Sequence, residues 1–321
     1  MSQRKKLSKI LLATIITVGV ALLFLSAILI TNIFIPVKYL SAYLNFSTDK
    51  PQKGEMRISF IDVGEGDCTL LELPDGKVAL FDGGSGSYNN QLKIFKKLNS
   101  FGIDKIDFFF CTSSSAKRCG GLAEIVKYKQ IDRLFAPIYK NIGATDSYRT
   151  FIKEVNNKSI AIDECVYGAG EYSREYGYAI CVLYPEKATQ DNGYDIVKSA
   201  SVWISYNGVN VLLLGDMSAS ELRDFSETYF VTGFEVNGLS VKLEECTIVK
   251  AVNGGKASGV YAPFYDLIQA KTAIISTNEE PDLALISNLE VYAGSNIYTT
   301  REHGTVTLNI SGGTYGVKKE R

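Results

Sequence analysis

Residues 60–84, FIDVGEGDCTLLELPDGKVALFDGG, decide the fold because they carry strand patterns in close succession. Apolar and polar residues alternate in the run MRISFIDVG that leads into this stretch, and a turn separates it from the apolar run CTLLELP. Asp75 and Gly76 form the Asp-Gly pair that typically closes a tight β-hairpin, here into KVALFDGG. The stretch therefore predicts paired strands at the start of a folded domain.

Outward from this stretch, helical and strand patterns alternate to the end of the chain. A helical pattern over residues 90–101 ends at Gly102, and the continuous apolar run IDFFFCT at 106–112 indicates a strand buried on both faces. Residues 199–216, SASVWISYNGVNVLLLGD, predict a second hairpin that turns at Asn-Gly, and residues 296–313 predict a final pair of strands. We therefore expect an α+β fold in which a mixed sheet sandwich is covered by helices.

The N-terminal segment predicts a membrane anchor. The uncharged apolar run at residues 10–37 is long enough to span a bilayer as a helix. It is preceded by the basic residues Arg4, Lys5, Lys6 and Lys9. A cleaved signal peptide is the alternative, but its apolar region is usually only ~7–15 residues long. Basic residues before a span favour a cytoplasmic N-terminus. The expected order is a cytoplasmic tail (1–9), a transmembrane anchor (10–37), a polar, irregular stalk (38–54) and an extracytoplasmic domain (55–321) in a single-pass protein of the cell membrane.

Composition excludes some classes of site. The 34 Lys and Arg residues against 35 Asp and Glu give a formal net charge of −1, so no bulk attraction to nucleic acid or to an anionic membrane is expected, which leaves only local charged patches. The chain has 1 histidine, which rules out a site built from several imidazoles. None of its 6 cysteines has the spacing of a zinc-binding pair. Cys165 and Cys181 could form a disulfide across a hairpin, and buried free thiols are the alternative.

Four separated stretches resemble the metallo-β-lactamase fold, particularly its branch related to the DNA-uptake protein ComEC/Rec2. They lie at residues 60–84, 106–122 (IDFFFCTSSSAKRCGGL), 201–218 (SVWISYNGVNVLLLGDMS) and 247–276 (TIVKAVNGGKASGVYAPFYDLIQAKTAIIS). The first resembles the opening F-x-D-V-G-Q-G-D, P-D-G-K and D-G-G of that branch. The second and fourth stand where the family carries T-H-x-H-x-D-H-x-G-G-L and H-H-G-S. The resemblance covers residues 55 to 321 and implies an αββα sandwich.

The same motifs depart from the family at its metal ligands. The resemblance assigns these former ligand positions: Ser113, Ser115, Lys117, Arg118, Asp216, Val252 and Asn253. Of these, only Asp216 keeps a ligand side chain, as the bridging carboxylate. The family acids retained in the chain are Asp62, Asp82 and Asp216. The single histidine, His303, matches no ligand position and is expected to be structural or exposed. We therefore expect no metal and no catalytic residue of the family type.

Physical chemistry suggests what replaces the metal. Zinc needs three or more ligands from imidazole, thiolate or carboxylate, and an ammonium or guanidinium repels the cation. Losing a metal between Asp82 and Asp216 would leave acidic groups without counter-charge. We therefore hypothesise that Lys117, Arg118 or both point inward and pair with these acids. The alternatives are that both side chains are solvated, or that one is free to bind an anion.

The sequence thus predicts a membrane-anchored extracytoplasmic pseudoenzyme that acts as a binding or accessory module at the cell envelope. Its ligand or protein partner is not named by the sequence, and nucleic acid is a partner by family analogy only. The alternative is a hydrolase of nucleic acid or another phosphodiester with an atypical zinc site. A serine nucleophile in residues 113–115 with Lys117 as base, or Cys119 as nucleophile, is a weaker alternative because no oxyanion site is recognisable.

Overall fold

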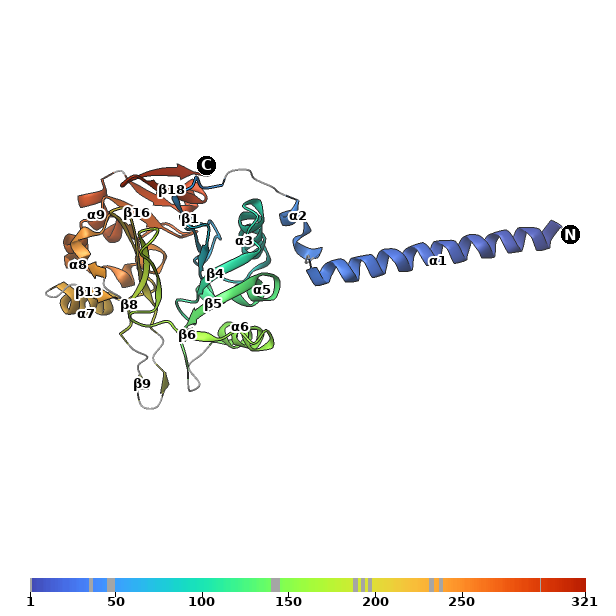
Figure 1. Cartoon of the computed structure of the whole chain (residues 1–321), viewed down its shortest axis with the longest axis horizontal. Helices are drawn as coiled ribbons and strands as arrows, with labels where there is room; N and C mark the ends of the chain where they lie inside the picture. The colour runs from blue at the N-terminus through green and yellow to red at the C-terminus, as the bar shows by residue number, and fades with distance from the viewer. Residues whose placement is uncertain are drawn as a thin grey trace.

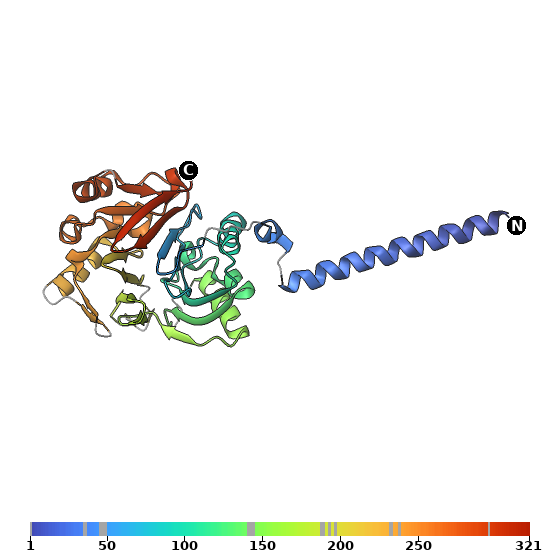
Figure 2. The same cartoon turned by 45° about the horizontal axis from the view of Figure 1, so that its top comes forward.

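Two β-sheets pack face to face in the computed structural model, and helices cover the outer face of each sheet (Figure 1, Figure 2). The structure describes residues 2–34, 37–44, 50–139, 145–186, 190–191, 194–195, 198–230, 234–236, 239–294 and 296–321. The layers follow the order helix, sheet, sheet, helix. The predicted αββα sandwich is confirmed.

The first sheet unites strands from both ends of the domain. Its order is β19 (Thr314–Lys319), β18 (Val306–Ser311), β1 (Met56–Phe60), β2 (Thr69–Glu72), β3 (Val78–Phe81), β4 (Lys105–Phe110), β5 (Gln130–Ala136) and β6 (Ile162–Glu164). The hairpin predicted at Asp75-Gly76 joins β2 to β3, and Gly76 takes the positive φ that this turn needs. β3, β4 and β5 run parallel, so their carboxyl ends lie at one edge of the sheet.

The second sheet is built from the later part of the chain. Its order is β17 (Ile297–Thr299), β16 (Thr272–Ile275), β15 (Ile248–Lys250), β12 (Val209–Leu213), β11 (Ser201–Tyr206), β8 (Tyr178–Tyr184) and β7 (Gly170–Ser173). The predicted hairpin at Asn207-Gly208 joins β11 to β12. The predicted final pair of strands in residues 296–313 is wrong, because β17 belongs to this sheet whereas β18 belongs to the first and pairs with β19.

Two short hairpins stand apart from these sheets. They are β9 (Gln190–Asp191) with β10 (Tyr194–Asp195), and β13 (Phe234–Val236) with β14 (Leu239–Val241).

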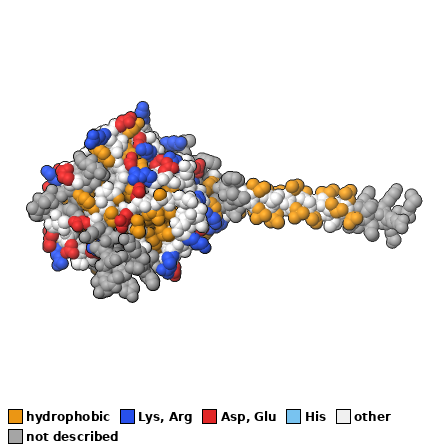
Figure 3. Space-filling model, turned by 60° about the horizontal axis from the view of Figure 1, so that its bottom comes forward, with side chains coloured by type: hydrophobic (Ala, Val, Ile, Leu, Met, Phe, Trp, Pro, Cys, Tyr) orange, Lys and Arg blue, Asp and Glu red, His pale blue; other side chains and the backbone are white. Residues whose placement is uncertain are grey.

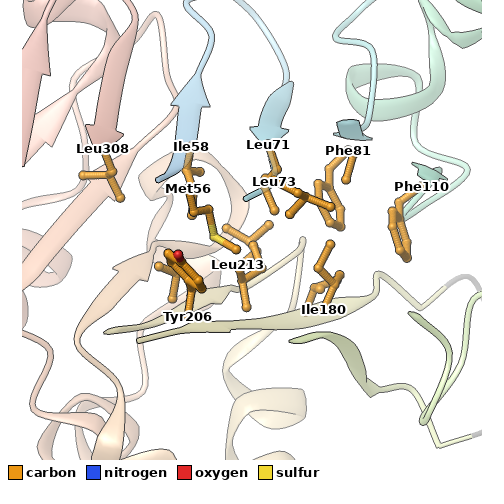
Figure 4. Close-up of a cluster of buried hydrophobic side chains, with 14 of the residues drawn as sticks. Met56, Ile58, Leu71, Leu73, Phe81, Phe110, Ile180, Tyr206, Leu213 and Leu308 are labelled. Atoms are coloured by element: carbon orange, nitrogen blue, oxygen red, sulfur yellow. The ribbon is translucent and has the colours of Figure 1, made fainter. Parts of the chain in front are cut away.

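Apolar side chains from both sheets fill the space between them. Figure 4 shows Ile58, Leu71 and Phe81 of the first sheet facing Ile180 and Leu213 of the second. Alternate residues of a strand point to opposite faces, so the continuous apolar run of β4 serves two cores. Phe108 and Phe110 join this inner core, whereas Phe109 lies beneath the helices on the other face. The prediction that this strand is buried on both faces is confirmed.

Each sheet has its own helical cover. The first sheet is covered by α3 (Tyr88–Ser100), α5 (Leu122–Tyr128) and α6 (Asp146–Asn157), with the short α4 (Ala116–Cys119) at its edge. The second sheet is covered by α7 (Ala219–Phe230), α8 (Ala262–Ile268), α9 (Leu283–Ala293) and η2 (Leu243–Glu245). The remaining short helices lie in loops at strand ends: η3 (Val252–Gly255), η4 (Ala257–Gly259) and α10 (Thr300–His303).

The six cysteines are buried free thiols. Cys165 follows β6 and packs in the core between the sheets, whereas Cys181 of β8 points to the opposite face of its strand. Gly170, rather than Cys165, lies opposite Cys181 in the β7–β8 hairpin. The disulfide considered from the sequence is therefore wrong, and the alternative of buried thiols is confirmed.

An apolar helix precedes the domain. α1 (Ser2–Phe34) contains a 20-residue segment, Leu11–Ile30, with a mean hydropathy of 2.6 and no part of it buried within the chain. Figure 3 shows apolar side chains along this helix. By length and composition the segment can cross a membrane, a test that a signal sequence near the N-terminus also passes.

The first part of the predicted stalk (38–54) is helical rather than irregular. Residues 37–43 form η1 (Val37–Tyr39) and α2 (Leu40–Tyr43), which pack on the outer side of α3 (Figure 1). Tyr39 and Ala42 are buried against Phe95. The prediction fails here because tertiary packing, which local polarity does not reveal, orders this segment. Residues 45–49 of the expected stalk lie outside the described residues.

Candidate functional site

The strand order brings charged residues from distant parts of the chain to one edge of the sandwich. Asp82 follows β3, and Asp216 lies just beyond β12. Lys250 is the last residue of β15, which is parallel to β12. The carboxyl ends of parallel strands are where α/β proteins commonly place functional side chains. Together with Asp67 and Arg118, these residues form what we call the Arg118 centre.

Arg118 lies at the middle of this centre and meets three carboxylates. Its Nη1 donates to Asp82 Oδ2 at 2.8 Å and lies 3.1 Å from Asp67 Oδ2. Its Nη2 donates to Asp216 Oδ1 at 2.8 Å. Only 6% of the Arg118 side chain is exposed, so the guanidinium occupies the inside of the site rather than the solvent. The planar fork of a guanidinium suits such multiple contacts with carboxylates.

Lys250 supplies a second internal cation. Its Nζ donates to Asp67 Oδ2, and 4% of its side chain is exposed. The Arg118 centre therefore holds two cations and three carboxylates, with a formal charge of −1. Asp216 is the most exposed of the carboxylates, with 27% of its side chain accessible. The two cations thus offset two of the three negative charges, and the excess negative charge lies at Asp216, on the side that faces solvent.

Local backbone geometry fixes the carboxylates before they meet Arg118. Asp82 takes a left-handed backbone conformation, with φ of 60°. The Thr112 backbone N–H donates to Asp82 Oδ1 at 2.8 Å and its hydroxyl donates to Oδ2 at 2.6 Å. Gly66 precedes Asp67, and a Cβ there would lie only 2.1 Å from the Lys117 carbonyl oxygen. Glycine is therefore required for the loop of Asp67 to close against the loop of Arg118.

The pKa values of the centre follow from burial and mutual attraction. Burial opposes the charged form of Asp67, but Lys250 and Arg118 outweigh it and lower its pKa. Burial raises the pKa of Asp82, against the opposing effect of Arg118. Burial also opposes the charge on Arg118, yet Asp216, Asp67 and Asp82 together raise its pKa well above its usual value. Arg118 therefore carries its charge throughout the pH range in which proteins fold.

Lys117, the neighbour of Arg118, points away from the centre. Its Nζ lies 3.0 Å from Glu65 Oε1, and 46% of its side chain is exposed. The hydrogen bond to Glu65 raises the pKa of Lys117 above its usual value, so this lysine is a poor general base. The hypothesis that one or both cations point inward and pair with Asp82 or Asp216 is therefore confirmed by Arg118 alone, because Lys117 pairs with Glu65.

A small hollow lies above the guanidinium. Its volume is about 40 Å³, enough for a few water molecules. Lys117 with Glu65, and Lys256 with Glu279 at 3.9 Å, line it as two ion pairs of opposite charges. These two ion pairs therefore give the hollow two positive and two negative side chains. An anion would have to compete with these carboxylates for the lysines.

The structure separates the remaining predicted positions from the centre. Ser113 is buried and its hydroxyl accepts from the Ser115 backbone N–H at 3.1 Å, and neither serine lines the hollow. Val252, the motif neighbour of Asn253, is wholly buried in a hydrophobic core and does not line the hollow. Asn253 does line the hollow, and its Nδ2 donates to Ser258 Oγ at 2.8 Å.

Asp62 has a structural role elsewhere. Its carboxylate lies 3.1 Å from the Lys93 ammonium and accepts from Arg321 at 3.1 Å, which ties the end of the chain to α3. Its retention therefore does not mark the site.

Sequence reasoning missed Asp67 and Lys250. The available signal was a charged residue at the end of the apolar run TIVK, because a lysine on a buried strand requires an acidic partner. Which acid would serve could not be read from the sequence, since Asp67 and Lys250 are 183 positions apart.

The donor set does not suit zinc. Each carboxylate of the centre already faces a guanidinium or an ammonium, and the guanidinium occupies the space between Asp82 and Asp216. Within the described residues, no group of three or more His, Cys, Asp and Glu side chains is arranged to hold a metal ion. His303 is in α10, where its Nδ1 lies 3.1 Å from the Thr299 carbonyl oxygen.

The nucleophiles considered from the sequence are poorly placed for catalysis. Ser114 is wholly buried. Burial raises the pKa of the Cys119 thiol to about 11, so it is protonated at neutral pH and is a weak nucleophile. Lys117 is held by Glu65, and no described hydrogen bond joins it to a serine. What the centre can do chemically is hold the two sheets together by charge.

The comparisons with known proteins give structural likenesses only. No family model matches the chain, and no curated protein matches it. Solved structures similar to it include the metallo-β-lactamase fold protein YhfI from Bacillus subtilis, which is 10% identical, with 82% of this chain and 100% of that chain covered at a TM-score of 0.49. Unliganded yeast PDE1 is 10% identical, with 76% and 97% covered and a TM-score of 0.46. The metallo-β-lactamase SMB-1, bound to 2-mercaptoethanesulfonate, is 13% identical, with 63% and 80% covered and a TM-score of 0.36. At these identities and TM-scores, the likenesses say nothing about activity, substrate or metal.

Proposed function

We propose that this protein is a membrane-anchored extracytoplasmic pseudoenzyme that serves as a binding or accessory module at the cell envelope. Its domain has the ComEC/Rec2-like scaffold suggested by the four motifs, and its metal centre has been replaced by internal ion pairs. The module therefore works without a cofactor.

The position of the Arg118 guanidinium carries this proposal. It donates at 2.8 Å to both Asp82 and Asp216, the two acids that the motif resemblance places around the metal. Lys250 neutralises Asp67 from the other side. A metal would have to displace a buried guanidinium and leave it without partners, which is costly. The centre thus keeps the fold closed, and the Lewis acid and bound hydroxide of the family mechanism have no place in it.

The membrane part of the proposal rests on α1. The segment Leu11–Ile30 has the length and apolarity of a span, and four basic residues precede it. That asymmetry supports a cytoplasmic N-terminus and an outer domain. The six cysteines are free thiols, and their burial shields them from oxidants.

Metal content of the full-length chain tests the proposal. The detergent-solubilised protein is incubated with Zn²⁺ or Mn²⁺, desalted and measured by elemental analysis, in parallel with an assay of phosphodiester hydrolysis. We expect far less than one metal per chain and no metal-dependent hydrolysis. One metal or more per chain, or hydrolysis that depends on it, would overturn the proposal in favour of an atypical hydrolase of nucleic acid or another phosphodiester.

A further inference from the structure

The segment that follows α1 is fixed to the domain by aromatic packing. Tyr39 of η1 is 2% exposed and stacks on Phe95 and Tyr88 of α3, with ring centroids 4.7 and 5.8 Å away. Ala42 of α2 is fully buried in the same cluster. Residues 37–43 thus belong to the folded domain rather than to a flexible linker.

Polar contacts lock the same segment in place. The Lys38 ammonium lies 2.7 Å from Glu124 Oε2 of α5. The Tyr88 hydroxyl donates to the Lys38 carbonyl oxygen at 2.9 Å. The segment is therefore held by both α3 and α5, the helices that cover the first sheet. Figures 1 and 2 agree in placing α2 on the outer side of this helical layer.

Chain length places this layer close to the membrane. α1 continues four residues beyond Ile30 to Phe34, a rise of about 6 Å. The three peptide steps from Phe34 to Val37 reach at most about 11 Å. The headgroup layer is itself about 5–8 Å thick on each side of a bilayer. Val37 therefore lies in the headgroup layer or within about one helix diameter of it.

The outer side of this layer has the chemistry of a membrane-contacting surface. Large apolar or aromatic side chains are exposed next to the span: Val37 (41%), Leu40 (43%), Leu44 (70%) and Tyr88 (52%). Lysines accompany them: Lys93, Lys96 and Lys97 on α3, and Lys127 on α5. The first three follow the i, i+3, i+4 spacing that places side chains on one side of a helix. Acids lie among these lysines as well: Asp62 pairs with Lys93 and Glu124 with Lys38. Glu320 lines the same hollow as the three lysines of α3, and Glu154 attracts Lys127.

We propose that this juxtamembrane face, formed by residues 37–44 and the lysines of α3 and α5, rests on the lipid headgroups beside the span and prefers anionic lipid. The inference depends on the membrane anchoring proposed above. Apolar and aromatic side chains enter the interface between headgroups and acyl chains, while lysines attract anionic headgroups. The hollow above Arg118 is lined by other segments and shares no residue with this face.

Site-specific fluorescence in vesicles tests this seating. The full-length chain is reconstituted into phosphatidylcholine vesicles with or without about one third phosphatidylglycerol. Single cysteines at Leu40→Cys and Lys96→Cys carry an environment-sensitive fluorophore, and the native thiols do not compete because they are buried. Val291→Cys is the matched control, since Val291 is an exposed aliphatic residue (66%) on α9, across the sandwich from α3. Quenching by lipids with a nitroxide near the headgroup is measured.

We expect quenching at positions 40 and 96 to exceed that at position 291 at least threefold, and to increase with phosphatidylglycerol. Adding Lys96→Glu and Lys127→Glu to the Leu40→Cys variant should remove the increase. Equal, weak quenching at all three positions in vesicles that retain the protein would overturn the seating. Equal quenching in the two lipid mixtures would overturn the preference for anionic lipid. Failure of the chain to float with vesicles would instead refute the anchor, a separate result.

Discussion

Arg118 and Lys129 are both buried cations, but their surroundings differ. Arg118 meets three carboxylates that come from both halves of the sandwich. Lys129, 1% exposed at the end of α5, donates to Asn99 Oδ1 at 2.7 Å and to the Ile103 carbonyl oxygen at 2.6 Å, and lies 3.0 Å from the exposed carboxylate of Asp104. One cation is balanced by charge, the other mainly by neutral oxygens.

The difference shows two ways of burying a charge. Burial lowers the pKa of Lys129, and Asp104 compensates only in part. At Arg118 the carboxylates outweigh burial and raise the pKa. Lys129 joins neighbouring parts of one helical layer, whereas Arg118 joins Asp82, which follows a strand of the first sheet, to Asp216, which follows a strand of the second. Asp216 is 98 positions from Arg118 in the sequence. Removing Arg118 should therefore destabilise the fold more than removing Lys129.

The largest expected effect is that of Arg118→Met. Three buried or half-buried carboxylates would lose their shared cation, so the free energy of unfolding should fall by about 3–5 kcal/mol. Denaturant unfolding of the full-length chain in detergent, followed by the fluorescence of the buried Trp203, measures this. Arg118→Lys keeps the charge but not the fork, and should give an intermediate loss. A loss below about 1 kcal/mol would mean that the centre does not hold the sheets together.

The same variant should gain a response to divalent cations. Without the guanidinium, Asp82 and Asp216 lose their cation while Asp67 stays paired with Lys250. The two unpaired carboxylates offer oxygen ligands of the kind that Ca²⁺ accepts. Millimolar Ca²⁺ should therefore raise the stability of Arg118→Met by about 1–3 kcal/mol through binding to the folded state alone, and leave the parent chain unchanged. The Arg118→Met, Asp82→Asn double variant is the control and should respond less. No response in Arg118→Met would indicate that the carboxylates separate when Arg118 is removed.

Sequence patterns predicted the fold more completely than they predicted the site. Asp75-Gly76 and Asn207-Gly208 predicted their hairpins correctly, because tight turns depend on residues that tolerate positive φ. The inward cation was also predictable, since two positive residues replaced ligands beside retained acids. The sequence could not predict which of Lys117 and Arg118 points inward, because this depends on the orientation of α4 about its own axis. Consecutive residues of a helix point about 100° apart, so only one of Lys117 and Arg118 can face the centre.

Other features of the chain also depend on tertiary structure. Val252 and Asn253 are adjacent in the motif, yet the Val252 side chain lies in the core whereas Asn253 lines the hollow. The order in residues 37–44 depends on Tyr39 stacking against α3, which is some 50 positions away in the sequence. Contacts over such separations are set by packing, which no local pattern records.

A smaller effect is expected for Lys129→Met. The change removes three polar contacts of the ammonium, but it also removes a charge that burial disfavours and keeps most of the side-chain volume. We expect a loss of about 1 kcal/mol, less than half that of Arg118→Met, in the same denaturant assay. Lys129→Ala should lose more, because it adds a cavity. A loss in Lys129→Met equal to that in Arg118→Met would erase the contrast between the two cations.

The attachment of the juxtamembrane segment to the domain should weaken at alkaline pH. Burial raises the pKa of Tyr39 from 10.0 to about 12. A group whose folded pKa is raised contributes fully below its unfolded pKa and loses that contribution as pH rises through the folded value. The segment should therefore loosen between pH 10 and about 12, measured as faster hydrogen exchange of residues 37–43 than in Tyr39→Phe at the same pH. Equal acceleration in both proteins would assign the effect to other groups.

The smallest effect is expected for Lys117→Ala. Its ion pair with Glu65 joins two side chains that are each about half exposed (46% and 51%), so solvent screens the attraction and the ordering of both side chains offsets it. We expect a change in stability within about 0.5 kcal/mol. The informative control is Glu65→Ala, which should behave alike if the pair is only a surface contact. A loss of stability near that of Arg118→Met would mean that Lys117 also stabilises the carboxylates of the Arg118 centre. The contrast between Arg118, which stabilises the fold, and its neighbour Lys117, which is exposed to solvent, would then no longer hold.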